Sequence, residues 1–557
     1  MRIQHGLLPF LILVTMIAPA VPSFAEDGAD LILQHGVFYP VQPPGRIEGS
    51  LAVRGGRIVY LGPDAGAQPL RGAKTRVVDL AGRTVTPGLI DAHSHLAGLG
   101  RALAEVDLTG AASYEEIVRR VREAAARVPA GTWVRGRGWD QNLWPGKQFP
   151  VHGPLSAAVP GHPVWLTRVD GHAALVNARA MEILGIGPEI QDPSGGRFLR
   201  DEGGRPTGVM VDNAMDVAGR LPAPAPAEVE RWLENAARHC LAVGLTTVTD
   251  MGIGEDVYRA YSTLRRADRL PLRASLFLTD DEALLSRWFQ RGPEIDPQAR
   301  LQVRGVKLYA DGALGSRGAA LLEPYSDDPG NMGLMVTAGQ RLEDVSRRAA
   351  RAGFQVGIHA IGDRGALVAV DAMEKALGGP RPEARFRLEH TQVVRVQDLE
   401  RMARLGIIAS MQPTHATSDM PWAGDRVGEH RLERAYAWRK VLDDGGRLAL
   451  GSDFPVESAD PRLGLYAAVT RQDLQGKPAG GWLPGERLTR EEALRGFTLD
   501  AAWSLFLDKE VGSLEVGKRA DLVVFARDVM TVPEPEIPKV GVDMTLVDGE
   551  IVYERQR

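Results

Sequence analysis

Two histidines separated by a single residue close the apolar stretch TVTPGLIDAHSHL, residues 84–96. If this stretch is a β-strand, its side chains alternate between two faces, so His93 and His95 point the same way. Two neutral imidazoles side by side supply half of a divalent-metal site. A pair with this spacing also arises by chance in loops, so the metal hypothesis depends on ligands from elsewhere in the chain.

Four later apolar stretches also end in a side chain that a metal site can use. They read VRGVKLYADG, FQVGIHAIGD, RFRLEHTQ and RLALGSDFP, and they supply Lys307, His359, His390 and Asp453. Taken singly, His359 could be a hydrogen-bonded core histidine and Asp453 could cap a turn. Five such strand ends in series favour one shared metal centre over five coincidences.

Lys307 is the least expected residue in this set, because a lysine in an apolar strand is costly unless it is paired or neutral. Desolvation lowers the pKa of a lysine, and the free amine can then add carbon dioxide to form an anionic carbamate that bridges two metals. The competing interpretation is a salt bridge to Asp311 or Asp453.

The elements that carry these residues alternate between strands and helical segments, a pattern typical of a parallel α/β domain. Eight strands suggest a (β/α)8 TIM-like barrel, in which catalytic groups sit at the carboxyl ends of the strands. The predicted strands are Pro87–His95, Gly244–Met251, Leu272–Leu278, Val303–Ala310, Gln355–Ile361, Arg385–Thr391, Ile407–Gln412 and Arg447–Asp453.

Short strands with glycine turns occupy both ends of the chain, and neither set is large enough to bury a core alone. We therefore predict that the two ends form one small β-sandwich. The gap between the first two barrel strands is too long for a simple connection and predicts a subdomain over the barrel mouth. The predicted segments are a signal peptide at 1–25, a composite β-sandwich at 26–86 and 510–557, the barrel at 87–509 and its insert at 107–230.

Aromatic and polar residues of the insert are candidate substrate contacts. They are Trp139, Asp140, Trp144, Trp165 and His172. The alternative is that the tryptophans fill the small core of the insert. Arg317 and Arg364 follow ligand-bearing strands and could hold a carboxylate, or could pair with nearby acids such as Asp311 or Asp363.

Composition excludes several classes of protein. The chain has 557 residues, 44% of them hydrophobic, and a net charge of −5, which argues against a nucleic-acid partner and against a polybasic membrane-surface protein.

The N-terminal segment resembles a signal peptide. It contains Arg2, an apolar run at 7–21 and small residues before position 26, which predict cleavage after Ala25 and export to the periplasm or outside the cell. The alternative is an uncleaved N-terminal anchor. A single cysteine, Cys240, excludes a disulfide within the chain.

Several motifs resemble the amidohydrolase superfamily, in particular its amidohydrolase-3 branch of YtcJ-like proteins and N-substituted formamide deformylases. These motifs are PGLIDAHSHL, GWDQNLW, DGHAALVN, VKLYADGALGSR, GIHAIGDR, EHTQ and LGSDFPV, and the likeness spans nearly the whole mature chain. The resemblance implies a role for each candidate ligand. His93, His95 and Asp453 bind a first metal, a carboxylated Lys307 bridges to a second metal held by His359 and His390, and Asp453 is the general base.

The resemblance also implies hydrolysis of a C–N bond in a small molecule such as an amide, an N-formyl or N-acyl compound, or a cyclic amide. One or two divalent ions are expected, zinc first, with manganese or iron as alternatives. Two other functions remain open. One is a single-metal deaminase or an ester or lactone hydrolase on the same scaffold, and the other is an exported binding or regulatory protein without catalysis. No stable membrane span is expected after cleavage, and a homodimer remains open.

Overall fold

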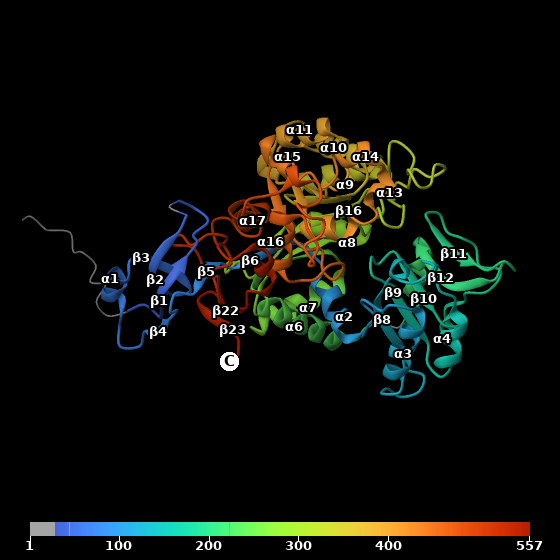
Figure 1. Cartoon of the computed structure of the whole chain (residues 1–557), viewed down its shortest axis with the longest axis horizontal. Helices are drawn as coiled ribbons and strands as arrows, with labels where there is room; N and C mark the ends of the chain where they lie inside the picture. Colours follow the sequence, from blue (N-terminus) through green and yellow to red (C-terminus); the bar gives the residue numbers. More distant parts are fainter. Residues whose placement is uncertain (1–27, 44, 222, 557) are drawn as a thin grey trace, which may run out of the picture.

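The computed structural model describes residues 28–43, 45–221 and 223–556, and its centre is a parallel barrel. Eight strands follow one another in spatial order from β6 to β20, with a short antiparallel strand, β15 (Glu294–Ile295), beside β16 (Figure 1). This confirms the predicted (β/α)8 fold. The barrel strands are β6 (Leu89–Ser94), β13 (Leu245–Ile253), β14 (Arg273–Leu278), β16 (Leu301–Tyr309), β17 (Gln355–Ala360), β18 (Arg387–His390), β19 (Ile408–Met411) and β20 (Leu448–Leu450).

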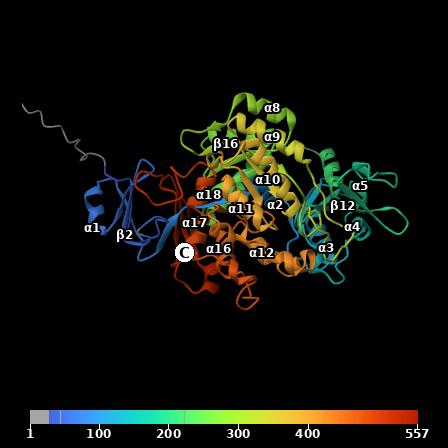
Figure 2. The same cartoon turned by 90° about the horizontal axis from the view of Figure 1, so that it is seen from above.

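The barrel strands are buried on both faces, which explains their nearly continuous apolar sequences. Amphipathic helices cover the outer face and alternate with the strands (Figure 2). The larger ones are α2 (Leu96–Ala104), α6 (Pro226–Ala242), α7 (Glu255–Arg266), α8 (Glu282–Arg291), α9 (Gly339–Arg351), α10 (Asp363–Leu377), α11 (Val396–Leu405), α16 (Pro461–Thr470), α17 (Arg490–Gly496) and α18 (Leu499–Ser504). Four shorter helices lie between β19 and β20, namely α12 (Pro413–Asp419), α13 (Ala423–Val427), α14 (Glu429–Leu432) and α15 (Trp438–Asp443).

A buried carboxylate joins the first and last barrel strands, which do not pair as a regular ladder. Asp91 of β6 accepts hydrogen bonds from the Ser452 amide at 3.1 Å and from the Ser452 hydroxyl at 2.6 Å. The amide of Asp453 donates to the carbonyl of His93 at 2.7 Å. The barrel therefore closes through residues that lie beside the candidate metal ligands.

The insert after β6 is a subdomain with its own sheet and its own cores. Its six strands have the order β11-β12-β10-β9-β8-β7, and it lies beside α2 (Figure 1). The strands are β7 (Val106–Asp107), β8 (Val134–Trp139), β9 (Val164–Arg168), β10 (Ala173–Val176), β11 (Gly196–Arg200) and β12 (Pro206–Asp212), and the helices are α3 (Tyr114–Ala125), α4 (His152–Ala158) and α5 (Ala178–Leu184).

Strands from both ends of the chain form one eight-stranded sheet, ordered β23-β22-β21-β5-β1-β2-β3 with β4 beside β1. β5 (Thr84–Pro87) lies between β1 (Leu31–Phe38) and β21 (Leu522–Phe525), so the N-terminal and C-terminal strands meet at this point. The other strands are β2 (Ile47–Arg54), β3 (Arg57–Gly62), β4 (Arg76–Asp79), β22 (Val542–Val547) and β23 (Glu550–Glu554), and the short helix α1 (Asp64–Ala67) follows β3.

The predicted signal peptide lies outside the described residues. Among the residues that are described, no helix combines the length and the hydropathy that a bilayer-spanning segment needs.

Candidate metal centre

The candidate ligands lie at the carboxyl ends of barrel strands, where this architecture places its reactive groups. His93, Lys307, His359 and His390 lie on β6, β16, β17 and β18, while His95 and Asp453 follow β6 and β20. The structure brings all six side chains to one end of the barrel.

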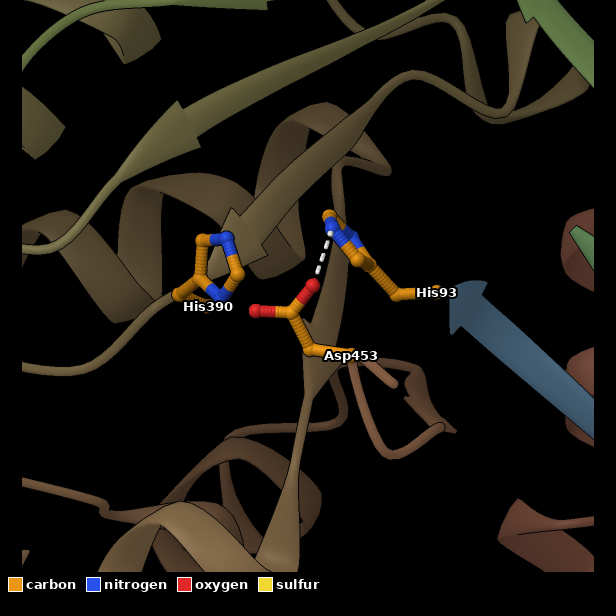
Figure 3. A group of neighbouring side chains, drawn as sticks. All are labelled: His93, His390 and Asp453. Atoms are coloured by element: carbon orange, nitrogen blue, oxygen red, sulfur yellow. Dashed lines mark ion pairs between the residues drawn. The ribbon is translucent and has the colours of Figure 1, made fainter. Parts of the chain in front are cut away.

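Asp453 lies at the centre of this group. Its Oδ1 atom is 3.1 Å from His95 Nε2. The same atom is 3.5 Å from His93 Nε2, the ion pair drawn as a dashed line in Figure 3. His93, His390 and Asp453 each offer one ligand atom, and these atoms lie within 4.8 Å of one another. A metal ion fits this spacing, and in the described part of the chain no other group of histidines, cysteines or acids does so.

His359 and Lys307 complete the group. The rings of His359 and His390 are 4.6 Å apart between centroids, and Lys307 Nζ is 3.2 Å from His93 Nε2. The Nδ1 atom of His359 is buried and has no hydrogen-bond partner among the described residues. A buried imidazole nitrogen without a hydrogen bond is energetically unfavourable. This atom therefore favours the presence of a bound ligand that the polypeptide itself does not supply.

Lys307 forms neither of the salt bridges considered from the sequence. Within the described chain, no carboxylate lies within 4.0 Å of its amine, and Asp311 instead accepts backbone hydrogen bonds from Ala320, Ile361 and Gly362. Burial lowers the pKa of Lys307 to about 8, against the opposing charges of nearby carboxylates. The amine is therefore free enough of its proton near neutral pH to react as a nucleophile.

Burial also holds the histidines in the neutral form that binds metal. It lowers the pKa of His93 to about 4 and lowers the pKa values of His359 and His390 well below the ordinary value. Burial alone would raise the pKa of Asp453, but its contact with His95 and its interaction with His93 outweigh burial and hold this pKa well below the ordinary value. His93, His359 and His390 are therefore neutral imidazoles around an ionised carboxylate.

Outer hydrogen bonds fix the orientation of three imidazoles. Glu389 Oε2 is 2.6 Å from His93 Nδ1, Gln412 Oε1 is 2.9 Å from His390 Nδ1, and the Met251 carbonyl is 3.0 Å from His95 Nδ1. Each contact occupies Nδ1, which leaves Nε2 to face the centre, as second-shell partners of metal ligands commonly do.

The backbone is strained at two of the ligands. His390 has φ 73° and Asp453 has φ 61°, and Thr391, directly after His390, has φ 48°. These left-handed values are unfavourable for residues other than glycine and persist where the surrounding structure enforces them, often at functional sites.

The insert tryptophans lie in apolar surroundings. Trp139 and Trp144 pack in one core of the insert, with their indole N–H groups bonded to the carbonyls of Leu166 and Ala111. Trp165 packs in the second core. Substrate contact by these residues stays a prediction, and their placement favours the alternative that they fill the insert.

The two polar candidates of the insert differ in their surroundings. Asp140 accepts from the Asn142 amide at 3.0 Å and pairs with Arg168 at 2.5 Å, so its oxygens have local partners. His172 is 33% exposed and its Nδ1 is 2.8 Å from Asp212 Oδ1. Burial opposes but does not cancel the rise in the pKa of His172 that Asp212 and nearby acids cause.

The two arginines proposed for carboxylate binding are placed differently. Arg317 forms a two-point pair with Asp327, at 3.1 and 2.9 Å. Arg364 lies exposed in the first turn of α10. Their role in substrate binding also stays a prediction.

Two residues close to the ligands escaped the sequence interpretation. Glu389 directly precedes His390 and, together with Arg387, forms a fully buried ion pair of 2.8 Å. His415 Nε2 lies 3.7 Å from Asp453 Oδ2, and its ring stacks on that of His390 at 5.8 Å. A signal for His415 exists, since this histidine lies three residues after the seventh predicted strand, Ile407–Gln412.

Known proteins resemble this chain over most of its length. The plant protein LONG AFTER FAR-RED 3 of Arabidopsis thaliana is 34% identical, covering 89% of this chain and 87% of that protein. The YtcJ protein of Bacillus subtilis, described as a putative amidohydrolase, is 32% identical over 86% of this chain and 91% of its own length. The N-substituted formamide deformylase of Arthrobacter pascens is 29% identical, covering 91% and 95%.

A solved structure and a family model agree with these relatives. The crystal structure of an uncharacterized metal-dependent hydrolase from Pyrococcus furiosus is 31% identical, covers 90% of this chain and 100% of its own, and has a TM-score of 0.73. The amidohydrolase family model, Amidohydro_3, matches residues 76–553. The chain therefore belongs to the amidohydrolase family and is an enzyme of the kind that hydrolyses carbon–nitrogen bonds.

Proposed function

We propose that this enzyme hydrolyses an amide-type C–N bond in a small molecule, with Asp453 as the general base beside one or two divalent ions. The observation that supports this most is the grouping of His93, His390 and Asp453, whose ligand atoms lie within 4.8 Å of one another. The name of the formamide deformylase supports an N-formyl or N-acyl substrate for this chain.

The residues present fit a divalent metal. Buried neutral imidazoles and an ionised carboxylate are ligands that zinc, manganese and iron accept, and the unpartnered Nδ1 of His359 adds a further donor. His93, His95 and Asp453 would hold one ion, and His359 and His390 a second, with Lys307 as a carbamate between them. A bound divalent ion would supply Lewis-acid activation of water and of the substrate carbonyl.

Asp453 is suited to move the proton in this reaction. It is ionised and nearly buried, so it can accept one proton from the attacking water as the new C–O bond forms. The same proton then passes to the departing nitrogen as the C–N bond breaks. Hydrogen bonds that His93, His95 and His390 donate to their outer partners keep the imidazoles in place during this exchange.

Metal content measured by mass spectrometry, on protein purified without chelators, is the first test. Near two equivalents per chain support the two-metal hydrolase, and about one equivalent favours a single-metal mechanism and a deaminase or an ester or lactone substrate. Absence of metal after reconstitution would refute the assignment of the six ligands.

The variant Asp453→Asn tests the base. We expect turnover of N-formyl and N-acyl compounds to fall at least 100-fold, as general acid–base groups contribute about 10²–10⁴-fold, while the circular dichroism spectrum is retained. Unchanged activity of the folded variant would exclude Asp453 as the base. We also propose export of the mature chain, which cell fractionation tests.

A further inference from the structure

Tyr309 lies beside the candidate metal centre, on the same strand as Lys307. The two residues are two positions apart on β16, so their side chains leave the same face of the strand. Lys307 Nζ is 5.0 Å from the centroid of the Tyr309 ring, and the centroids of the Tyr309 and His359 rings are 5.7 Å apart. The phenol ring therefore borders the group of candidate ligands on the side of Lys307 and His359.

A glycine leaves room for the hydroxyl group of this tyrosine. The register of β13 shifts at Gly252, whose φ is 75°. A Cβ atom on Gly252 would lie 3.2 Å from Tyr309 Oη and 3.8 Å from Lys307 Cγ, so the two side chains approach this glycine together. The preceding residue, Met251, accepts the hydrogen bond from His95 Nδ1. The hydroxyl group therefore lies at the strand end that holds a candidate ligand.

The hydroxyl group of Tyr309 is accessible and has no partner. Tyr309 is 37% exposed, although it ends a strand that is otherwise mostly buried. Among the described residues, Tyr309 Oη makes no hydrogen bond. A phenol keeps its proton at neutral pH and can therefore donate one hydrogen bond. An accessible donor beside buried candidate ligands is available to a small molecule that binds there.

The strand of Tyr309 lies opposite the strand that precedes the proposed general base. Three strands separate β16 from β20 in either direction around the barrel, β17 to β19 one way and β14, β13 and β6 the other way. Asp453 follows β20. A carbonyl group bound at the centre of the barrel mouth would therefore have the carboxylate on one side and the phenol on the other.

The chemistry of an amide indicates which atom this donor would meet. An amide nitrogen accepts hydrogen bonds poorly, because its electron pair is delocalised over the carbonyl group, so the carbonyl oxygen is the acceptor. Negative charge develops on this oxygen when water attacks the carbonyl carbon. A donor that is already in place stabilises that charge.

We propose that Tyr309 is a further catalytic residue, whose hydroxyl group donates a hydrogen bond to the carbonyl oxygen of the scissile bond. As the water oxygen bonds to the carbonyl carbon, the π electron pair of the carbonyl moves onto its oxygen. The water proton passes to Asp453, while the tyrosine proton stays on Tyr309. The hydrogen bond strengthens as charge develops, so it acts on kcat more than on KM. This inference rests on the proposed hydrolysis of an amide-type bond.

The test is Tyr309→Phe, which removes the hydroxyl group and keeps the ring. Its matched control is Tyr60→Phe, which removes a hydroxyl group that donates to the Pro63 carbonyl at 2.6 Å in the sheet of the chain ends. The substrates are para-nitroformanilide and para-nitroacetanilide, whose hydrolysis releases coloured para-nitroaniline. We expect kcat of Tyr309→Phe to fall about 100-fold or more, the effect of losing one oxyanion donor, while KM changes less than about threefold.

Metal content, measured by mass spectrometry, shows whether the loss arises at the hydroxyl group. Tyr309→Phe should bind as much metal as the wild type, and the control should match the wild type in both kinetics and metal content. A kcat of Tyr309→Phe within about threefold of the wild-type value, or a loss of kcat that comes with a loss of metal, would overturn the inference.

Formate binding separates this inference from the proposed function. Formate, the acid released from a formanilide, presents oxygen atoms to the same donor without reacting. Calorimetry on the metal-reconstituted proteins should show that Tyr309→Phe binds formate about tenfold more weakly than the wild type. If the wild type hydrolyses neither anilide but shows this difference, the proposed N-formyl or N-acyl hydrolysis fails and the donor site stands. If Tyr309→Phe binds formate no more weakly than the wild type, the donor site is overturned, whether or not the anilides are hydrolysed.

Discussion

Replacing Glu389 by leucine should weaken both the fold and the metal site, for separable reasons. Glu389 and Arg387 are each 0% exposed and pair at 2.8 Å, while the second oxygen of Glu389 is 2.6 Å from His93 Nδ1. Removing one member of a buried ion pair costs about 3–5 kcal/mol, because the other charge is left without compensation. Losing the outer partner of a ligating histidine lowers metal affinity about 10- to 100-fold, or about 1.4–2.7 kcal/mol.

A double variant, Glu389→Leu with Arg387→Met, separates the two effects. Replacing both members of a buried ion pair by apolar residues is often neutral for stability. We therefore expect the double variant to recover most of the free energy of unfolding, measured in urea, that the single variant loses. Zinc affinity, measured on the same proteins by competition with a chelating dye, should stay low because His93 still lacks its partner. If the double variant also regains zinc affinity, the lower zinc affinity of Glu389→Leu came from its lower stability. If the single variant binds zinc within twofold of the wild type, Glu389 does not orient His93.

Three further predictions follow from neighbouring features. Lys307→Ala should lower bound metal by mass spectrometry, and short carboxylic acids should partly restore it; unaltered metal content would exclude the bridging carbamate. Burial raises the pKa of Asp419 to about 7, so the folded state binds more protons than the unfolded state between about pH 4 and 7, and stability is lost as the pH rises through this range. The free energy of unfolding in urea is therefore measured for Asp419→Asn and for the wild type at pH 5.5 and at pH 8.5. The variant's value minus the wild-type value should rise by up to about 2 kcal/mol between these two pH values, and a difference that does not change with pH would refute this. A Cβ atom at Gly451 would lie 2.5 Å from Asp91 Oδ1, so Gly451→Ala should lower the melting temperature and metal binding while Gly485→Ala, in open space, changes neither.

The barrel could be predicted from the sequence because its strands carry a local signal. Both faces of each strand are buried, so residues such as those of β17 form short apolar runs that end in a polar ligand. The boundaries were less accurate where the ligands lie. Leu448–Leu450 is shorter than the predicted Arg447–Asp453, since Asp453 leaves the strand with φ 61°.

Contacts between distant segments could not be predicted in this way. The pairing of His93 with Glu389 joins β6 to β18, and no local pattern indicates which acid meets which histidine. Trp139 shares a core with Val134 because the register of β8 shifts at Gly138, which an alternating pattern does not reveal. The insert tryptophans had two interpretations, and the choice between them depends on how two cores pack around one sheet.

The sheet shared by both chain ends has a consequence for the order of folding. β5 pairs with β21, in which Leu522 lies opposite Pro87, and β21 is near the end of the chain. During synthesis this edge of β5 therefore stays without a hydrogen-bonding partner until nearly the whole chain has emerged. Contacts between such distant segments form slowly, and an unpaired strand edge invites association with other chains. Completion of this sheet is therefore expected late, after the barrel has formed, and the yield of native protein should depend on the last strands more than their small share of the core suggests.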